Sequence, residues 1–148
     1  MYEVVRTRKT TVPGAIAYFY MMKPRKFYYS LLIVHGVYVL LTAIWALIDI
    51  GSFMSVTGPK SDIWLVKTVA VLLLPISLCI LFPLFSSINP LLSILVSMLS
   101  AAGLAAIDFY YTSNNTISAV YQYDGILQIL FLISWLYILV KNRRSVAS

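Results

Sequence analysis

The sequence predicts an all-α integral membrane protein, a bundle of four transmembrane helices in antiparallel, up-and-down order. Of its 148 residues, 61% are hydrophobic and only 11% are charged, whereas soluble domains carry about 25% charged residues. Apolar runs of roughly 20 residues recur along the chain, and this is the length needed to cross a hydrocarbon layer about 30 Å thick. We therefore expect a multi-pass protein whose main surroundings are the lipid bilayer.

The first element is a basic N-terminal segment, residues 1–26, with six Lys or Arg residues against the single acid Glu3. Its middle is apolar and aromatic but too short to span the membrane. Such a segment typically lies partly in the membrane interface, with its bases on anionic lipid. Docking of a protein or of nucleic acid is the alternative, and we favour the interface and predict no nucleic-acid partner.

The predicted spans cover residues 27–48, 63–85, 90–108 and 123–140, inside a bundle that runs from residue 27 to residue 141. Pro75 and Pro83 should kink the second span or loosen its last turn. Only a few residues separate the second span from Pro90, the expected first residue of the third span, so spans two and three should be antiparallel neighbours. A basic tail, residues 142–148, ends the chain.

Basic residues gather at the two ends of the chain, because residues 1–26 and 141–148 hold nine of the eleven Lys and Arg. Cytoplasmic segments of membrane proteins retain Lys and Arg, and an even number of spans returns the chain to the side from which it started. We therefore expect both termini in the cytoplasm. The charged residues between the spans then fall on or near the outer face of the membrane.

Charged positions correspond between the two halves of the chain. Asp49 and Asp108 each follow an apolar span, and Lys67 and Asp124 each lie early in the next span. The match suggests two tandem helical hairpins, although similar apolar segments also arise by chance. Asp49, Asp108 and Lys67 oppose the dipoles of their predicted helices. We therefore predict that Lys67 bridges two or more aspartates; the alternative is that the charges are solvated separately.

Polar side chains line one face of span one and continue along span four. Their spacings of three and four residues place them on one side of each helix. Polar groups are costly in lipid, so these faces should turn toward other helices or a cavity. An outward-opening polar cavity and interhelical hydrogen bonding without a cavity both remain open. The candidate ligand-binding residues are His35, Tyr38, Thr42, Trp45, Asp49, Lys67, Asp108, Asp124 and Gln128.

A strip of small residues follows span three at intervals of four residues. Small side chains at this spacing let a neighbouring helix approach closely, so the strip predicts helix packing. No base accompanies its serines at a recognisable spacing, and we predict no catalytic residue there. The helix-packing residues are Ser93, Ser97, Ala101 and Ala105.

Several kinds of chemistry are excluded by what the chain lacks. Cys79 is the only cysteine, so there is no intramolecular disulfide and no paired-thiol redox chemistry. His35 is the only histidine, and nothing resembles a metal-binding spacing. We therefore predict no metal and no cofactor.

Two segments carry a more specific pattern: Asp62-Ile-Trp-Leu-Val-Lys-Thr-Val, and Ala105-Ala-Ile-Asp-Phe-Tyr-Tyr with the Ile117-Ser-x-Val-Tyr that follows. Together they resemble an uncharacterised set of small bacterial four-helix integral membrane proteins with no known activity. The resemblance covers spans two to four. It implies a location in the bacterial inner (plasma) membrane and implies no reaction.

Three functions fit these patterns. We place first an accessory or structural subunit of a membrane assembly, in which the strip of span three docks a membrane-protein partner or a second copy of the chain. Second is a membrane protein that binds a lipid-like or small amphiphilic ligand in the polar cavity. A proton-coupled transporter or an enzyme comes third, because the charges lie too near the membrane boundary for a midplane coupling site. An open pocket favours the second function and a packed interior the first.

Overall fold

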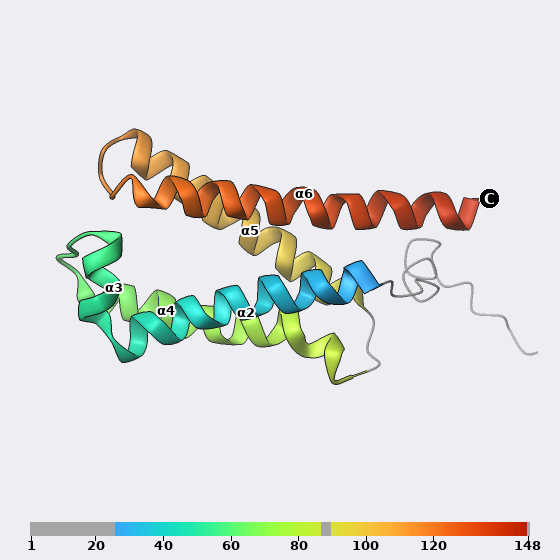
Figure 1. Ribbon diagram of the computed structural model, residues 1–148, viewed down its shortest axis with the longest axis horizontal. Coiled ribbons are helices and arrows are strands. Elements are labelled where there is room, and N and C mark those ends of the chain that lie inside the picture. The colour runs from blue at the N-terminus through green and yellow to red at the C-terminus, as the bar shows by residue number, and fades with distance from the viewer. Residues whose placement is uncertain (1–25, 87–89, 148) are drawn as a thin grey trace, which may run out of the picture.

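A computed structural model describes residues 26–86 and 90–147, with side chains described as far as Lys141. The predicted interfacial placement of the N-terminal segment falls on residues outside these ranges. Within them the chain is helical and contains no strand (Figure 1). The elements are α2 (Lys26–Ile48), α3 (Ile50–Thr57), α4 (Ile63–Leu81), the short 3₁₀ helix η1 (Phe82–Leu84), α5 (Pro90–Ser113) and α6 (Val120–Ala147).

Four helices are long and apolar enough to cross a membrane: α2, α4 with η1, α5, and α6 as far as Lys141. The predicted all-α fold with four candidate spans is therefore confirmed. The helices also expose large apolar side chains, among them Ile48, Trp64 and Leu99. A soluble protein rarely leaves so much apolar surface to water, and lipid is the environment that suits it.

The four long helices form two hairpins, which lie beside each other in Figure 1. α2 packs along α4 and α5 packs along α6, whereas α2 and α6 touch at few places. Glycine permits the closest approach inside the first hairpin, because a Cβ atom on Gly36 would lie 2.5 Å from Leu81 Cγ. We call the interface between the α2–α4 hairpin and the α5–α6 hairpin the seam.

The small residues predicted for helix packing, Ser93, Ser97, Ala101 and Ala105, are all buried in this chain. The hydroxyl of Ser93 donates a hydrogen bond to the carbonyl oxygen of Ile80 on α4, at 2.9 Å. The strip thus lies against neighbouring helices of the same chain.

α5 continues beyond the predicted end at residue 108, so Asp108 lies inside a helix and not at its C-terminus. Neither glycine nor proline interrupts residues 104–113. The helix ends where Asn115 adopts a left-handed conformation, with φ of 55°. The Thr116 N–H then donates to the Tyr111 carbonyl oxygen at 2.9 Å, a closure typical of helix C-termini. The predicted position of Asp108 at a helix end was wrong.

α3 was not predicted; the sequence suggested a loop there. Asp49 separates α2 from α3 and caps the new helix, because its Oδ1 accepts a hydrogen bond from the Ser52 N–H at 3.0 Å. A carboxylate at a helix N-terminus is favourably placed in the helix dipole. The sequence pattern predicted that Asp49 opposes the dipole of the span before it. That prediction did not include α3, whose dipole Asp49 complements. Phe53 of α3 is buried against Ala46 and Ala70.

The ends of α4 and α6 also differ from the predicted bounds. The last turn of the second span is the 3₁₀ helix that contains Pro83, as expected for a proline that removes a backbone hydrogen bond. α6 begins at Val120, before the predicted start at 123, and it stays helical to Ala147. The predicted tail, residues 142–148, is thus largely a continuation of this helix.

Candidate ligand-binding site

The seam is closed toward the end of the bundle where α2 begins. The rings of His35 and Phe131 stack with centroids 4.2 Å apart, and Trp135 Nε1 donates a hydrogen bond to His35 Nδ1 at 3.2 Å. Tyr28 packs edge-on against Trp135, with ring centroids 6.0 Å apart. All four side chains are buried. We call these four residues the closed half of the seam.

The protonation of His35 follows from this geometry. Nδ1 accepts a hydrogen bond, so the ring is neutral and carries its proton on Nε2. Within the part of the chain that the structure describes, Nε2 has no hydrogen-bond partner. His35 therefore packs and orients its aromatic neighbours and does not line a cavity.

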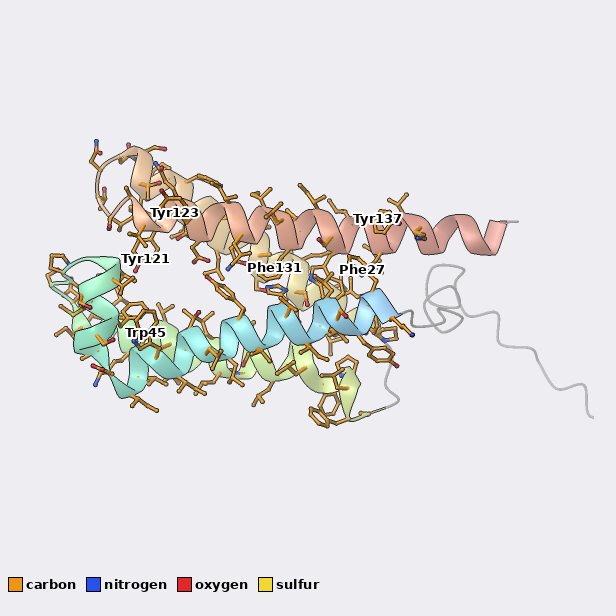
Figure 2. The ribbon with its side chains drawn as sticks, in the orientation of Figure 1. Phe27, Trp45, Tyr121, Tyr123, Phe131 and Tyr137 are labelled. Atoms are coloured by element: carbon orange, nitrogen blue, oxygen red, sulfur yellow. The ribbon has the colours of Figure 1, made fainter. Side chains whose placement is uncertain are left out.

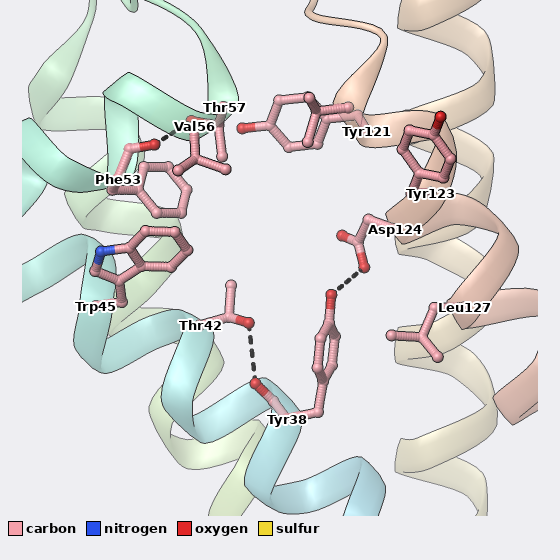
Figure 3. A pocket seen from close by; sticks show the side chains of 11 residues that line it. Tyr38, Thr42, Trp45, Phe53, Val56, Thr57, Tyr121, Tyr123, Asp124 and Leu127 are labelled. Atoms are coloured by element: carbon pink, nitrogen blue, oxygen red, sulfur yellow. Dashed lines mark hydrogen bonds between the residues drawn. The ribbon is translucent and has the colours of Figure 1, made fainter.

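Toward the α3 end the hairpins separate and leave a cavity of about 300 Å³ (Figure 3). We call this region the open half of the seam. Figure 2 places Trp45 and Tyr121 on opposite sides of it and Phe131 further along the seam. The lining comes from α2 (Tyr38, Thr42, Trp45), α3 (Phe53, Val56, Thr57) and α6 (Val120, Tyr121, Tyr123, Asp124, Leu127).

α3 positions the aromatic wall of the first hairpin. The indole N–H of Trp45 donates to the Ser52 hydroxyl at 3.1 Å, and its ring meets Phe53 edge-on with centroids 5.4 Å apart. On the other side of the cavity the Tyr121 hydroxyl points toward Thr57 (Figure 3). The cavity is therefore walled by rings whose orientation depends on the short helix between the spans.

One hydrogen bond across the seam forms the floor of the cavity. The Tyr38 hydroxyl donates to Asp124 Oδ1 at 2.5 Å, and Gln128 Nε2 donates to the same oxygen at 3.3 Å. Tyr38 also contacts Phe131, with ring centroids 5.9 Å apart. Tyr38 thus marks the boundary between the closed and the open half.

A second carboxyl group lies behind the first. Asp108 of α5 is buried, and its carboxyl group interacts with that of Asp124. Its Oδ2 has no hydrogen-bond partner among the described residues. In residues 26–86 and 90–141, no lysine pairs with either carboxyl group. The floor therefore holds two neighbouring acids without a partner base from this part of the chain.

Lys60 is the base at the edge of this region. Its ammonium donates to the carbonyl oxygens of Thr57 and Gly58, at 2.8 and 3.2 Å, and lies 4.9 Å from the centre of the Tyr121 ring. Partial burial holds the pKa of Lys60 below its usual value. Lys60 links the loop of the first hairpin to α6 and leaves the acids on the floor unpaired.

The structure brings four of the predicted ligand-binding residues to the cavity: Tyr38, Thr42, Trp45 and Asp124. Asp108 and Gln128 lie behind Asp124, without lining the cavity, and His35 belongs to the closed half. Asp49 is exposed and caps α3.

The predicted bridge through Lys67 is wrong. Lys67 is exposed on α4 and forms no ion pair with an aspartate of the described residues. The reason is the packing order, because α4 packs mainly on α2 and α5 while Asp124 lies on α6. A lysine in the early turns of α4 therefore faces away from the cavity.

Seven lining residues were missed: Phe53, Val56, Thr57, Val120, Tyr121, Tyr123 and Leu127. A signal existed for α3, because Ile50, Phe53, Met54 and Thr57 follow the spacing of an amphipathic helix directly after a capping residue. The first turn of α6 gave no comparable signal. Its tyrosines follow a polar loop, and the sequence does not show where that loop ends and the helix begins.

Comparison with family models, with curated protein sequences and with solved structures found no match to this chain. The function must therefore be inferred from the geometry of the site. Among the described residues, no group of three or more His, Cys, Asp or Glu is placed to hold a metal ion. The open half offers apolar and aromatic walls with one carboxylate and a few hydroxyls, an arrangement suited to a molecule with an apolar body and a polar head.

Proposed function

We propose that this protein is a multi-pass membrane protein that binds a small amphiphilic molecule in the open half of the seam. The observation that carries the proposal is the cavity of about 300 Å³ between the two hairpins. Small-molecule pockets of proteins span roughly 300–1,000 Å³, with mostly apolar walls and a few polar groups. The cavity lies at the small end of this range, which suits a short-chain amphiphile better than a whole phospholipid.

The accessory-subunit hypothesis stays a prediction, but it has less support than ligand binding. It relied on a strip of span three that docks another protein, and that strip is buried inside this chain. It also expected a packed interior, whereas the open half contains a cavity. A proton-coupled transporter or an enzyme likewise stays a prediction of the sequence.

Photolabelling tests the proposal directly. The probe is a medium-chain alcohol that carries a diazirine, added to the purified protein in phosphatidylcholine vesicles. We expect saturable labelling of cavity residues, Trp45, Tyr121 or Tyr123 among them, as located by mass spectrometry. Labelling confined to lipid-facing residues, without saturation, would contradict the proposal.

A pair of variants on one turn of α6 controls for general effects of substitution. Leu127 lines the cavity, whereas its neighbour Ile126 is 51% exposed on the outside of the bundle. Leu127→Trp should fill the cavity and abolish saturable labelling, and Ile126→Trp should leave it unchanged. Equal labelling of the two variants would show that the probe binds elsewhere.

We further propose that the protein resides in the inner (plasma) membrane with both termini in the cytoplasm, which places the open half toward the outer face. The support for the orientation is that residues 1–26 and 141–148 hold nine of the eleven Lys and Arg. The support for the inner membrane is the resemblance to small bacterial four-helix membrane proteins.

Cysteine labelling tests this orientation. In a Cys79→Ala background, an impermeant thiol reagent applied to intact cells should label Ser113→Cys, at the end of α5, and should spare Ser148→Cys. Permeabilised cells should show both cysteines labelled, which proves that each is reactive. The reverse pattern in intact cells would invert the topology.

A further inference from the structure

We infer that the ligand of the open half is an organic cation, an ammonium group joined to an apolar body, and that the Asp124 carboxylate is its counter-ion. The inference rests on the proposed function, since it concerns the same cavity. It is carried by three features of the site: the unpaired acids on the floor, the positions of the nearby bases, and the aromatic walls.

The first feature is a negative charge without a partner. Asp124 lies on the cavity wall, and the groups that hydrogen-bond to it are a phenol and an amide, both neutral. Asp108, only 4% exposed, stands behind it with Oδ2 unpartnered within the described residues. Partly buried charges are normally paired.

The second feature is the distribution of bases. Lys60 is already held by two carbonyl oxygens and the Tyr121 ring. Lys26 and Lys67 are exposed on the first hairpin, outside the cavity lining, and Lys141 donates to the Tyr137 hydroxyl near the far end of α6. None of the described bases is therefore placed to neutralise Asp124, and a cationic ligand in the cavity would supply the compensating charge.

The third feature is the set of aromatic rings that line the same cavity as the carboxylate, contributed by Tyr38, Trp45, Phe53, Tyr121 and Tyr123. Aromatic faces attract ammonium groups, and quaternary ammonium ligands are typically recognised in this way. Tyr121 already receives one ammonium in this structure, that of Lys60. A ligand with an anionic head group would be repelled by the acids on the floor. A ligand with a neutral head group would leave Asp124 without an ion-pair partner among the described residues. The cavity should therefore prefer a cation.

Competition against the diazirine alcohol tests the inference. The competitors share one octyl chain and differ only in the head: trimethylammonium, hydroxyl or sulfate. In phosphatidylcholine vesicles, we expect the ammonium compound to prevent photolabelling at about tenfold lower concentration than octanol. An ion pair with the carboxylate and a cation–π contact together increase the affinity by about this factor. Octyl sulfate should compete least.

Asp124→Asn is the decisive variant. Asparagine keeps an oxygen that can accept the hydrogen bond from Tyr38 and removes the charge, so the alcohol should still label the cavity while the preference for ammonium disappears. Asp62→Asn is the matched control, because Asp62 is an exposed acid outside the cavity, and it should keep the full preference. Should Asp124→Asn not fold, Thr42→Lys places a fixed ammonium in the cavity lining and should equally abolish the preference.

The outcomes separate this inference from the proposed function. The inference of a cationic ligand is overturned if saturable labelling by the alcohol shows no preference for ammonium, or if the preference survives Asp124→Asn or Thr42→Lys. Either result leaves the proposed ligand-binding function in place. Absence of saturable labelling at the cavity overturns both.

Discussion

Both halves of the seam lie between α2 and α6, with α3 added in the open half, but one half is packed and the other contains a cavity. In the closed half, His35 finds a hydrogen-bond donor in Trp135 and a stacking partner in Phe131. In the open half, the corresponding space between α2 and α6 is a cavity, and its floor carries Asp124 and, behind it, Asp108. Similar polar stripes therefore produce close packing at one end and a cavity at the other.

The difference shows what a polar residue in a membrane helix signals. A buried imidazole that accepts one hydrogen bond from a neighbouring indole is a neutral packing element, and such interactions act mainly as interhelical contacts. A carboxylate at the edge of a cavity, with only neutral donors bonded to it, has a charge that no described base compensates. Intramembrane acids of this second kind are the better functional candidates.

The largest expected effect contrasts the tryptophans of the two halves. Trp135 is fully buried, whereas Trp45 is 37% exposed beside the cavity. Trp135→Ala should lower the free energy of unfolding by about 3–5 kcal/mol, through lost contacts and a new void. Trp45→Ala, which enlarges an existing cavity, should cost only about 1 kcal/mol.

Unfolding of both variants in mixed detergent micelles, followed by circular dichroism, measures this contrast. Because Trp45 lines the cavity, its variant should instead lose photolabelling by the diazirine alcohol. Equal losses of stability would mean that the two halves are packed alike, and the comparison between them would fail.

A smaller effect is expected for the glycines. A Cβ atom on Gly36, beside the closed half, would lie 2.5 Å from Leu81 Cγ, whereas one on Gly51 of α3 would meet nothing nearer than Asp49 Oδ1 at 3.6 Å. Gly36→Ala should therefore destabilise by about 1–3 kcal/mol. Gly51→Ala should stabilise, by at most about 1 kcal/mol, because alanine is the better helix former.

Thermal unfolding of the two glycine variants in the same detergent gives the sign of each effect. A stable Gly36→Ala variant would show that Leu81 moves aside easily and that the close approach of α2 to α4 is not required.

Sequence patterns predicted the fold well, because the length and apolarity of a span depend on local composition alone. Four candidate spans followed from this, and so did Tyr38, Thr42 and Trp45 as neighbours on one helical face. The lining contributed by α3 depended on the path of a connection, which hydropathy does not describe. Phe53 and Thr57 reach the cavity only because Asp49 starts a new helix that folds back over α2.

The charges illustrate a second limit of the sequence. Asp49, Asp108 and Lys67 were expected to oppose the dipoles of their helices, and this suggested that Lys67 meets two or more of the aspartates. Whether they meet depends on which helices are neighbours across the seam, where α2 faces α6 and α4 faces α5. Helical periodicity assigns a residue to a face of its own helix, but it does not name the helix that this face contacts.

The smallest expected effect follows from this misplaced lysine. Lys67 is exposed and has no ion-pair partner in the described residues, so Lys67→Met should change the free energy of unfolding by no more than about 0.5 kcal/mol. Its combination with Asp49→Asn should be additive, since asparagine also caps a helix well and the two side chains are independent. A double-mutant cycle in detergent measures the coupling. A coupling energy of about 1 kcal/mol or more would show that Lys67 interacts with Asp49, and the bridge predicted from the sequence would regain support at that aspartate.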